Sequence, residues 1–183
     1  MNRACLAVLL PLSFGLPACS GSNGGSDPAG PQNANVAGTW DYDATNLSGS
    51  VAGFSVSCAV RDAVLLLDQQ GTSFSGTRDA GILECVVEGK QDELRLDAPN
   101  PIRGGQVSGN QIKFGYTGSF NVPFLVTFLQ EVTGATIGTV TASFDHSGTA
   151  SGNSMSGTIA VEAGFGPNVG VLSMTGNWSA SRR

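Results

Sequence analysis

The amino-acid sequence predicts an all-β fold, a single antiparallel up-and-down β-barrel of about eight to ten strands. From residue 36 onward, apolar residues alternate with polar ones instead of recurring at helical spacing. Glycine-containing turn pairs separate the alternating segments. The chain has 26 glycines and 40% hydrophobic residues, a mixture too glycine-rich for a helical bundle and too apolar for a disordered chain. Its 183 residues suffice for one such domain.

Alternation is clear in the first segment of the barrel. Gly38, Trp40 and Tyr42 share one face, whereas Asp41 and Asp43 share the other and are expected to face water. Such two-faced segments are typical of antiparallel strands with one side in the core. The predicted strands span residues 36–46, 53–60, 63–70, 73–79, 82–88, 103–108, 111–118, 122–130, 136–146, 154–163 and 169–181. We expect some of these segments to be continuous or bulged.

Tight turns connect neighbouring strands. Gly109-Asn110 and Gly152-Asn153 are pairs that adopt the positive φ angles of hairpin turns. Connections this short favour a meander, and closing the meander into a barrel removes the exposed edges that promote aggregation.

Residues 120–129 (FNVPFLVTFL) depart from the pattern because they are apolar on both strand faces. A strand covered by a neighbouring segment explains this, and Pro123 then favours an edge or a bulge. A short helix is the other structural explanation, with Leu125, Phe128, Leu129 and Val132 on its apolar face. A contact surface for a ligand, a partner or the bilayer is the functional alternative.

Residues 1–18 have the features of a signal peptide. Arg3 precedes an apolar run of 15 residues, 4–18, that is interrupted by two prolines and is too short to span a membrane as a helix. The next segment, 19–35, is rich in glycine, serine, proline and asparagine and is predicted to be a flexible linker. The barrel domain is assigned to residues 36–183.

The number and positions of the cysteines are consistent with an exported protein. Removing residues 1–18 takes away one of the four cysteines and leaves Cys19, Cys58 and Cys85. Cys58 and Cys85 lie inside the barrel domain and are predicted to form a disulfide that closes a loop of 27 residues. A metal site is the alternative, but two distant cysteines without a nearby histidine make a poor one. Cys19 is then the first residue of the processed chain and has no partner.

The residues Leu16-Pro17-Ala18-Cys19 resemble the lipobox of bacterial lipoprotein precursors. This resemblance implies that the Cys19 sulfur receives a diacylglyceryl group and that the freed amine is acylated. Several acyl chains anchor a protein stably to a membrane. The resemblance places the protein in the cell envelope, and Ser20 after the cysteine implies the outer membrane. The alternative is a secreted protein with a free thiol at Cys19.

Gly38-Thr39-Trp40 at the start of the barrel and Arg182 near its end resemble the calycin superfamily, which includes lipocalins and avidin-like proteins. The resemblance implies that Trp40 lies at the closed end of the barrel and that Arg182 packs across it. Arg183 is the competing candidate, because a shift of one residue reverses the face.

The remaining polar residues give no catalytic, cofactor or metal motif. His146 is predicted to be a polar residue at a strand end, since its neighbour Asp145 points to the opposite face and cannot orient it. Asp92 and Glu93, with Asp97, are assigned to a polar loop without calcium-loop spacing. The net charge is −5 and no basic stripe is present, which argues against nucleic acid as a partner.

The sequence therefore predicts a non-catalytic envelope lipoprotein without a cofactor, whose barrel binds a small, largely apolar ligand. The alternative is a solid barrel that serves as a scaffold or an inhibitor of another envelope protein. A ligand-binding barrel requires an interior cavity of a few hundred Å³, on the order of known ligand sites.

Overall fold

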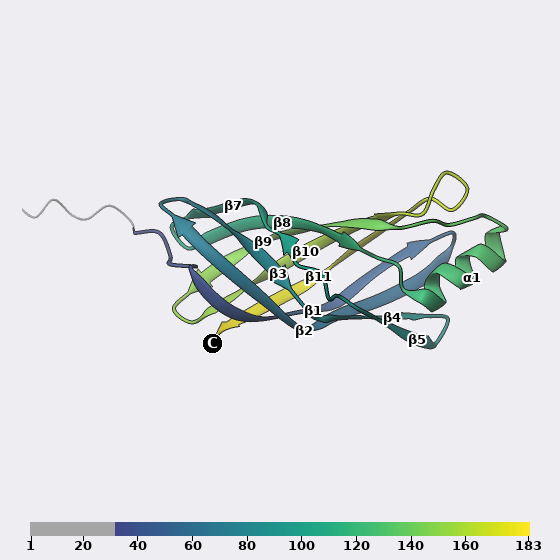
Figure 1. Ribbon diagram of the computed structural model, residues 1–183, viewed down its shortest axis with the longest axis horizontal. Helices are drawn as coiled ribbons and strands as arrows, with labels where there is room; N and C mark the ends of the chain where they lie inside the picture. Colours follow the sequence, from purple (N-terminus) through teal and green to yellow (C-terminus); the bar gives the residue numbers. More distant parts are fainter. Residues whose placement is uncertain (1–31) are drawn as a thin grey trace, which may run out of the picture. The chain divides into compact units, whose positions relative to one another are not determined.

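The computed structural model describes residues 32–183, which form an antiparallel β-structure with one short helix in the described chain (Figure 1). The strands are β1 (Gly38–Val51), β2 (Phe54–Gln70), β3 (Ser73–Asp79), β4 (Ile82–Val87), β5 (Lys90–Arg95), β6 (Asn100–Pro101), β7 (Arg103–Ser108), β8 (Gln111–Ser119), β9 (Thr141–Ser151), β10 (Ser154–Gly164) and β11 (Val171–Arg182). The helix is α1 (Pro123–Thr133). The predicted all-β fold class is confirmed. The predicted signal peptide and Cys19 lie outside the described residues.

Eight strands form a closed ring in the order β2-β1-β11-β10-β9-β8-β7-β3, because β3 also pairs with β2. Each pair of neighbours is antiparallel. Strands adjacent in the ring follow one another along the chain except where β1 pairs with β11 and where β4, β5 and β6 intervene between β3 and β7. This is the predicted up-and-down barrel. The predicted strands 53–60 and 63–70 are one continuous strand, β2.

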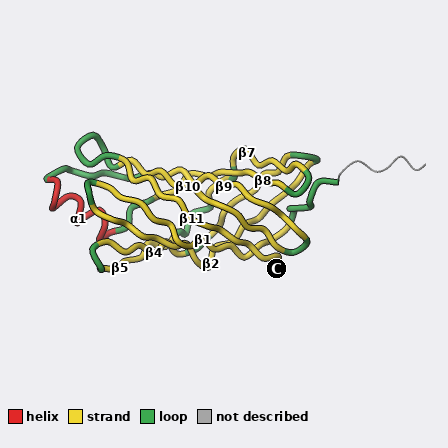
Figure 2. Tube along the Cα trace, turned by 180° about the vertical axis from the view of Figure 1, so that it is seen from behind, coloured by secondary structure: helices red, strands yellow, loops and turns green. Residues whose placement is uncertain are grey.

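Strand β2 has two partners in succession along its length. Its second half, Val64–Gln70, pairs with β3, whereas Val56–Arg61 pairs with β4. The chain between β3 and β4 is interrupted at Ala80 and Gly81, both at positive φ. Strand β5 then pairs with β4 and has no second strand partner among the described residues. Helix α1, which follows β8, packs against β5 instead (Figures 1 and 2).

Two sequence predictions are corrected in this region. The predicted strand 122–130 is wrong, and the helical alternative holds: Leu125 and Leu129 are buried on one side of α1. The helix has proline in its first turn and ends at Gly134, whose left-handed conformation closes it. The polar loop assigned to residues 92–93 is also wrong, because both residues belong to β5.

Two glycines face each other across neighbouring strands of the barrel wall. Gly148 in β9 pairs with Gly157 in β10. An added Cβ at Gly157 would lie 2.0 Å from the carbonyl oxygen of Ser147, and one at Gly148 would lie 2.1 Å from that of Ser156. Side chains are therefore excluded at these two positions, and the strands can coil closely.

Large buried side chains come from the ring strands, from β4 and from the segment that contains α1. The residues with the largest fully buried side chains are Trp40, Tyr42, Leu47, Leu65, Arg78, Leu83, Ile112, Phe120, Leu125, Leu129, Phe144 and Met155. Helix α1 lies at the end of the barrel away from the start of the described chain (Figure 2). Val36 and Trp40 are buried near the start of the described chain, and Leu125 and Leu129 are buried on α1. The described domain is thus a packed barrel with both ends covered.

Candidate functional site

The centre of the barrel holds a cluster of aromatic rings around His146. The imidazole of His146 stacks on Phe114 with centroids 4.2 Å apart and an interplanar angle of 9°. Its Nε2 lies 2.8 Å from the hydroxyl oxygen of Tyr42. Trp178 contacts the imidazole edge to face at 5.5 Å, and Tyr116 lies at the same centroid distance. These contacts fix the imidazole between opposite walls of the barrel.

The predicted placement of His146 at a strand end is wrong. It lies inside β9 and is 3% exposed, because the inward alternation of Ala142 and Phe144 continues through it. Asp145 faces outward, as expected, and does not contact the imidazole. Burial lowers the pKa of His146 to about 3, so the side chain is neutral at neutral pH.

A second buried polar group, Arg78 in β3, lies at the interruption of the barrel wall. It is 2% exposed. Nη1 donates to the carbonyl oxygens of Ala80 at 2.6 Å and Leu96 at 3.4 Å, and Nη2 donates to the side-chain oxygen of Asn100. The guanidinium carbon is 5.3 Å from the ring centroid of Tyr116. Arg78 thereby satisfies carbonyl groups that lie beyond the ends of β3 and β5.

The end at which the described chain begins is closed by Trp40 and Arg182. The guanidinium carbon of Arg182 lies 4.4 Å from the Trp40 ring centroid. Its nitrogens donate to the carbonyl oxygens of Ala37 at 2.7 Å and Asn35 at 2.8 Å. The indole nitrogen of Trp40 donates to the Val36 carbonyl at 2.9 Å. A cation–π contact and three hydrogen bonds therefore hold residues 35–37 against this end of the barrel.

Arg183, the competing candidate, lies on the outer surface and pairs with Asp41 at 2.6 Å. Asp41 and Asp43 are both exposed, as the alternation predicts. Gly38 has a φ of +130°, and an added Cβ there would lie 3.0 Å from Nη1 of Arg182. The glycine of Gly38-Thr39-Trp40 is therefore needed to place Arg182 over the ring.

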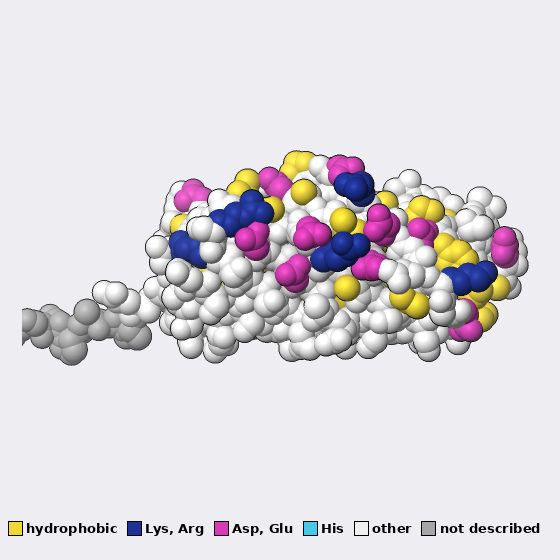
Figure 3. Space-filling view, turned by 90° about the horizontal axis from the view of Figure 1, so that it is seen from below, with side chains coloured by type: hydrophobic (Ala, Val, Ile, Leu, Met, Phe, Trp, Pro, Cys, Tyr) yellow, Lys and Arg dark blue, Asp and Glu magenta, His cyan; other side chains and the backbone are white. Residues whose placement is uncertain are grey.

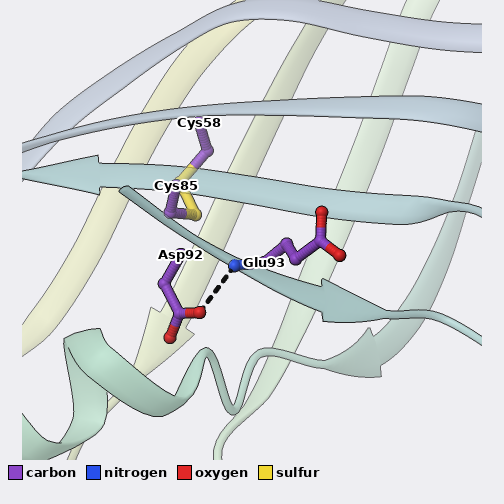
Figure 4. The surroundings of a disulfide bond; sticks show 4 residues. All are labelled: Cys58, Cys85, Asp92 and Glu93. Atoms are coloured by element: carbon purple, nitrogen blue, oxygen red, sulfur yellow. Dashed lines mark hydrogen bonds between the residues drawn. A yellow bond between two sulfur atoms is a disulfide. The ribbon is translucent and has the colours of Figure 1, made fainter. Parts of the chain in front are cut away.

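The opposite end combines the disulfide with the start of α1 (Figure 4). Cys58 and Cys85 face each other across β2 and β4 and are bonded to each other. Cys85 pairs in turn with Asp92 of β5. One carboxylate oxygen of Asp92 accepts a 2.6 Å hydrogen bond from the backbone N–H of Phe124, in the first turn of α1. Asp92 thus caps the helix from a different part of the chain.

The outer side of α1 carries an aromatic patch, which we define as Phe54, Phe124, Phe128 and Val132. Phe128 contacts Phe54 edge to face at 4.8 Å and Phe124 at 5.9 Å. The three rings are half-buried, and Val132 is 46% exposed. The ammonium of Lys90 lies 5.1 Å from the Phe124 centroid. Figure 3 shows hydrophobic and basic side chains together toward the α1 end.

The most spacious grooves described lie outside the ring of strands. One of about 750 Å³ is lined by residues of β1 and β8 to β11, including Asn46, Lys113, Asp145 and Thr158. A second groove of about 730 Å³ is lined by residues of β1, β2, the β4–β5 turn and β11, including Ser50, Ser57 and Ser173. A third, of about 420 Å³, is lined by Gln106, Ser108, Gln111 and Lys113. These grooves are open to solvent.

Within residues 32–183, no helix has the length and apolar character needed to cross a bilayer. The same residues contain no group of three or more histidine, cysteine or acidic side chains arranged to hold a metal ion. Comparisons of the chain with protein-family models, with curated proteins and with solved structures gave no match.

Proposed function

We propose that this chain is a non-catalytic lipoprotein of the bacterial outer membrane whose barrel acts through its surface, as a scaffold or inhibitor that contacts another envelope protein. The observation that carries this proposal is the packed interior. Ligand-binding barrels enclose cavities of roughly 300–1,000 Å³. Here the aromatic side chains around His146 are in mutual contact, and side chains close both ends. A solid barrel is therefore favoured over one that holds a bulky apolar ligand.

The lipid anchor is supported by the cysteine pairing. Cys58 and Cys85 are bonded to each other. Once residues 1–18 are removed, Cys19 is therefore left over, at the position that a lipobox requires. Acylation at Cys19 explains a cysteine at the front of an exported chain.

The aromatic patch at α1 is the surface that we assign to the partner. Residues 33 and 34 bind Gly109 in the turn between β7 and β8, so the described chain starts at the end opposite α1 (Figures 1 and 2). In this proposal, a lipid anchor upstream of residue 32 connects to the barrel at the end away from the patch. Apolar side chains surrounded by polar ones are typical of contact surfaces.

A photocrosslinker at Val132 tests the surface assignment in intact envelopes. The matched control is Leu66 on the outer face of β2, which is 41% exposed, whereas Val132 is 46% exposed. We expect one dominant protein adduct from position 132, abolished by Phe128→Asp, and no adduct of that mass from position 66. Equal crosslinking from both positions, or none from position 132, would contradict the assignment.

A further inference from the structure

Arg78 carries a positive charge in the barrel wall and forms no ion pair with a carboxylate of the described residues. The ion pairs of residues 32–183 involve Arg61 and Arg183 only. The acceptors of Arg78 are two backbone carbonyls and one amide oxygen, all uncharged. Burying a guanidinium without an opposite charge carries a large desolvation cost, which a nearby anion offsets.

The two tyrosines nearby do not supply the missing negative charge. Burial raises the pKa of Tyr116 to about 12, even though Arg78 and Tyr42 act in the opposite direction. Burial also raises the pKa of Tyr42 well above its usual value. Both phenols therefore stay neutral at physiological pH and can only donate or accept hydrogen bonds.

Two buried donors in this region lack an acceptor. Within residues 32–183, Nε of Arg78 and the hydroxyl of Tyr116 have no hydrogen-bond partner, although both side chains are only 2% exposed. Oδ1 of Asp79, the next residue in β3, is also buried without a partner. The guanidinium lies beside the Tyr116 ring. Buried N–H and O–H groups are nearly always paired, so each unpaired donor requires an explanation. A positive charge with two free donors has the chemistry of an anion site.

We propose that Arg78 and Tyr116 bind one small monovalent anion inside the barrel wall, either a halide or the carboxylate of a short organic acid. Nε of Arg78 donates a charge-assisted hydrogen bond to it, and the Tyr116 hydroxyl donates a second. Tyr116 packs against Phe144 at 4.7 Å and lies 5.5 Å from His146, so only a small ligand fits beside its hydroxyl. The site is independent of the aromatic patch at α1, and either assignment can fail without the other.

Thermal unfolding of the full mature chain tests the site. Chloride, bromide, formate or acetate is added in increasing concentration, and a sulfate salt keeps the ionic strength constant. A ligand that binds only the folded state at ten times its Kd shifts the folding equilibrium about elevenfold. We expect a saturable increase in Tm that is absent in Arg78→Met and weakened in Tyr116→Phe. Arg103→Met, which alters an exposed arginine of β7, should respond like the wild type.

The titrations separate the two sources of the anion. If the increase in Tm saturates only with halides, the ligand is an inorganic anion. If it saturates with formate or acetate, the ligand is a carboxylate. If Arg78→Met does not fold, two other experiments test the site. One is the anion titration of Tyr116→Phe, and the other is a crystal structure of the wild-type protein grown in bromide. An anomalous bromide peak beside Nε of Arg78 supports a halide site. The proposal is overturned if no anion gives a saturable increase, or if Tyr116→Phe responds like the wild type.

Discussion

The hydroxyl of Tyr42 in β1 lies 2.8 Å from Nε2 of His146 in β9, and this hydrogen bond crosses the barrel interior. In the ring, β11 and β10 separate the two strands. The bond therefore ties one wall to another through the core, where the imidazole is held neutral by burial. The polar pair gives the aromatic cluster a single orientation that apolar contacts alone would not impose.

Acid should destabilise the barrel through His146, which is the only histidine of the chain. Its pKa is lowered from 6.5 to about 3 in the folded state, so the unfolded chain binds a proton at pH values where the folded chain does not. Stability is complete above pH 6.5 and falls as the pH decreases toward 3, by up to about 1.4 kcal/mol per pH unit. Urea unfolding at pH 7.5, 6 and 5 measures this slope.

His146→Gln is the control for that slope, because glutamine can still bond to Tyr42 but does not titrate. The variant should be less stable at pH 7.5 yet show a flatter dependence between pH 7.5 and 5. An unchanged slope in the variant would assign the acid sensitivity to other groups.

Arg182 should contribute more to the free energy of unfolding than Arg183. Arg182→Ala removes the contact with Trp40 and two hydrogen bonds, and should lower the free energy of unfolding by about 2 kcal/mol. Arg183→Ala removes only an exposed pair with Asp41 and should cost less than about 1 kcal/mol. Chemical denaturation of both variants provides the comparison. Similar losses in the two variants would mean that the contacts of Arg182 with Trp40 and residues 35–37 contribute little to the free energy of unfolding.

The disulfide should stabilise the domain by restricting the unfolded chain. Cys58 and Cys85 close a loop of 27 residues, for which chain entropy gives about 3.5 kcal/mol. The double variant Cys58→Ala/Cys85→Ala should therefore remain folded but unfold at lower urea concentration. A loss below about 1 kcal/mol would contradict this entropic contribution of the disulfide.

Asp92→Ala should loosen α1 while leaving the ring of strands intact. Removing a carboxylate from a helix N-terminus costs about 0.5–2 kcal/mol. Faster amide hydrogen exchange in α1 but not in β9 or β10 is the expected result. Asp97→Ala, in the exposed loop after β5, should leave the exchange unchanged. Equal effects of both substitutions would contradict the capping role of Asp92.

Alternation predicted most of the barrel because the ring strands have one face in the core and one in water. It missed β5 because KQDELR has a polar residue at nearly every position. That composition is possible because β5 lies at the edge of the sheet. It assigned a strand where α1 lies, because the helix buries Leu125 and Leu129 while its other side carries the aromatic patch.

The buried polar residues were the harder part of the site to predict. Phe74, Gly76 and Arg78 alternate along β3, so the inward position of Arg78 could have been read from the spacing. Its partners could not, since Leu96 and Asn100 approach only where the chain leaves β5. For His146, the polar residues that follow it in the sequence suggested a strand end, but β9 continues to Ser151.

Native mass spectrometry of the protein, purified in mild detergent from the cells that produce it, tests most directly whether the barrel is solid. The account predicts the mass of a chain that begins at Cys19 and carries acyl groups, with no organic molecule larger than a short acid retained. A lipid or other bulky apolar compound that stays with the folded chain in one-to-one ratio and is released on unfolding would contradict it.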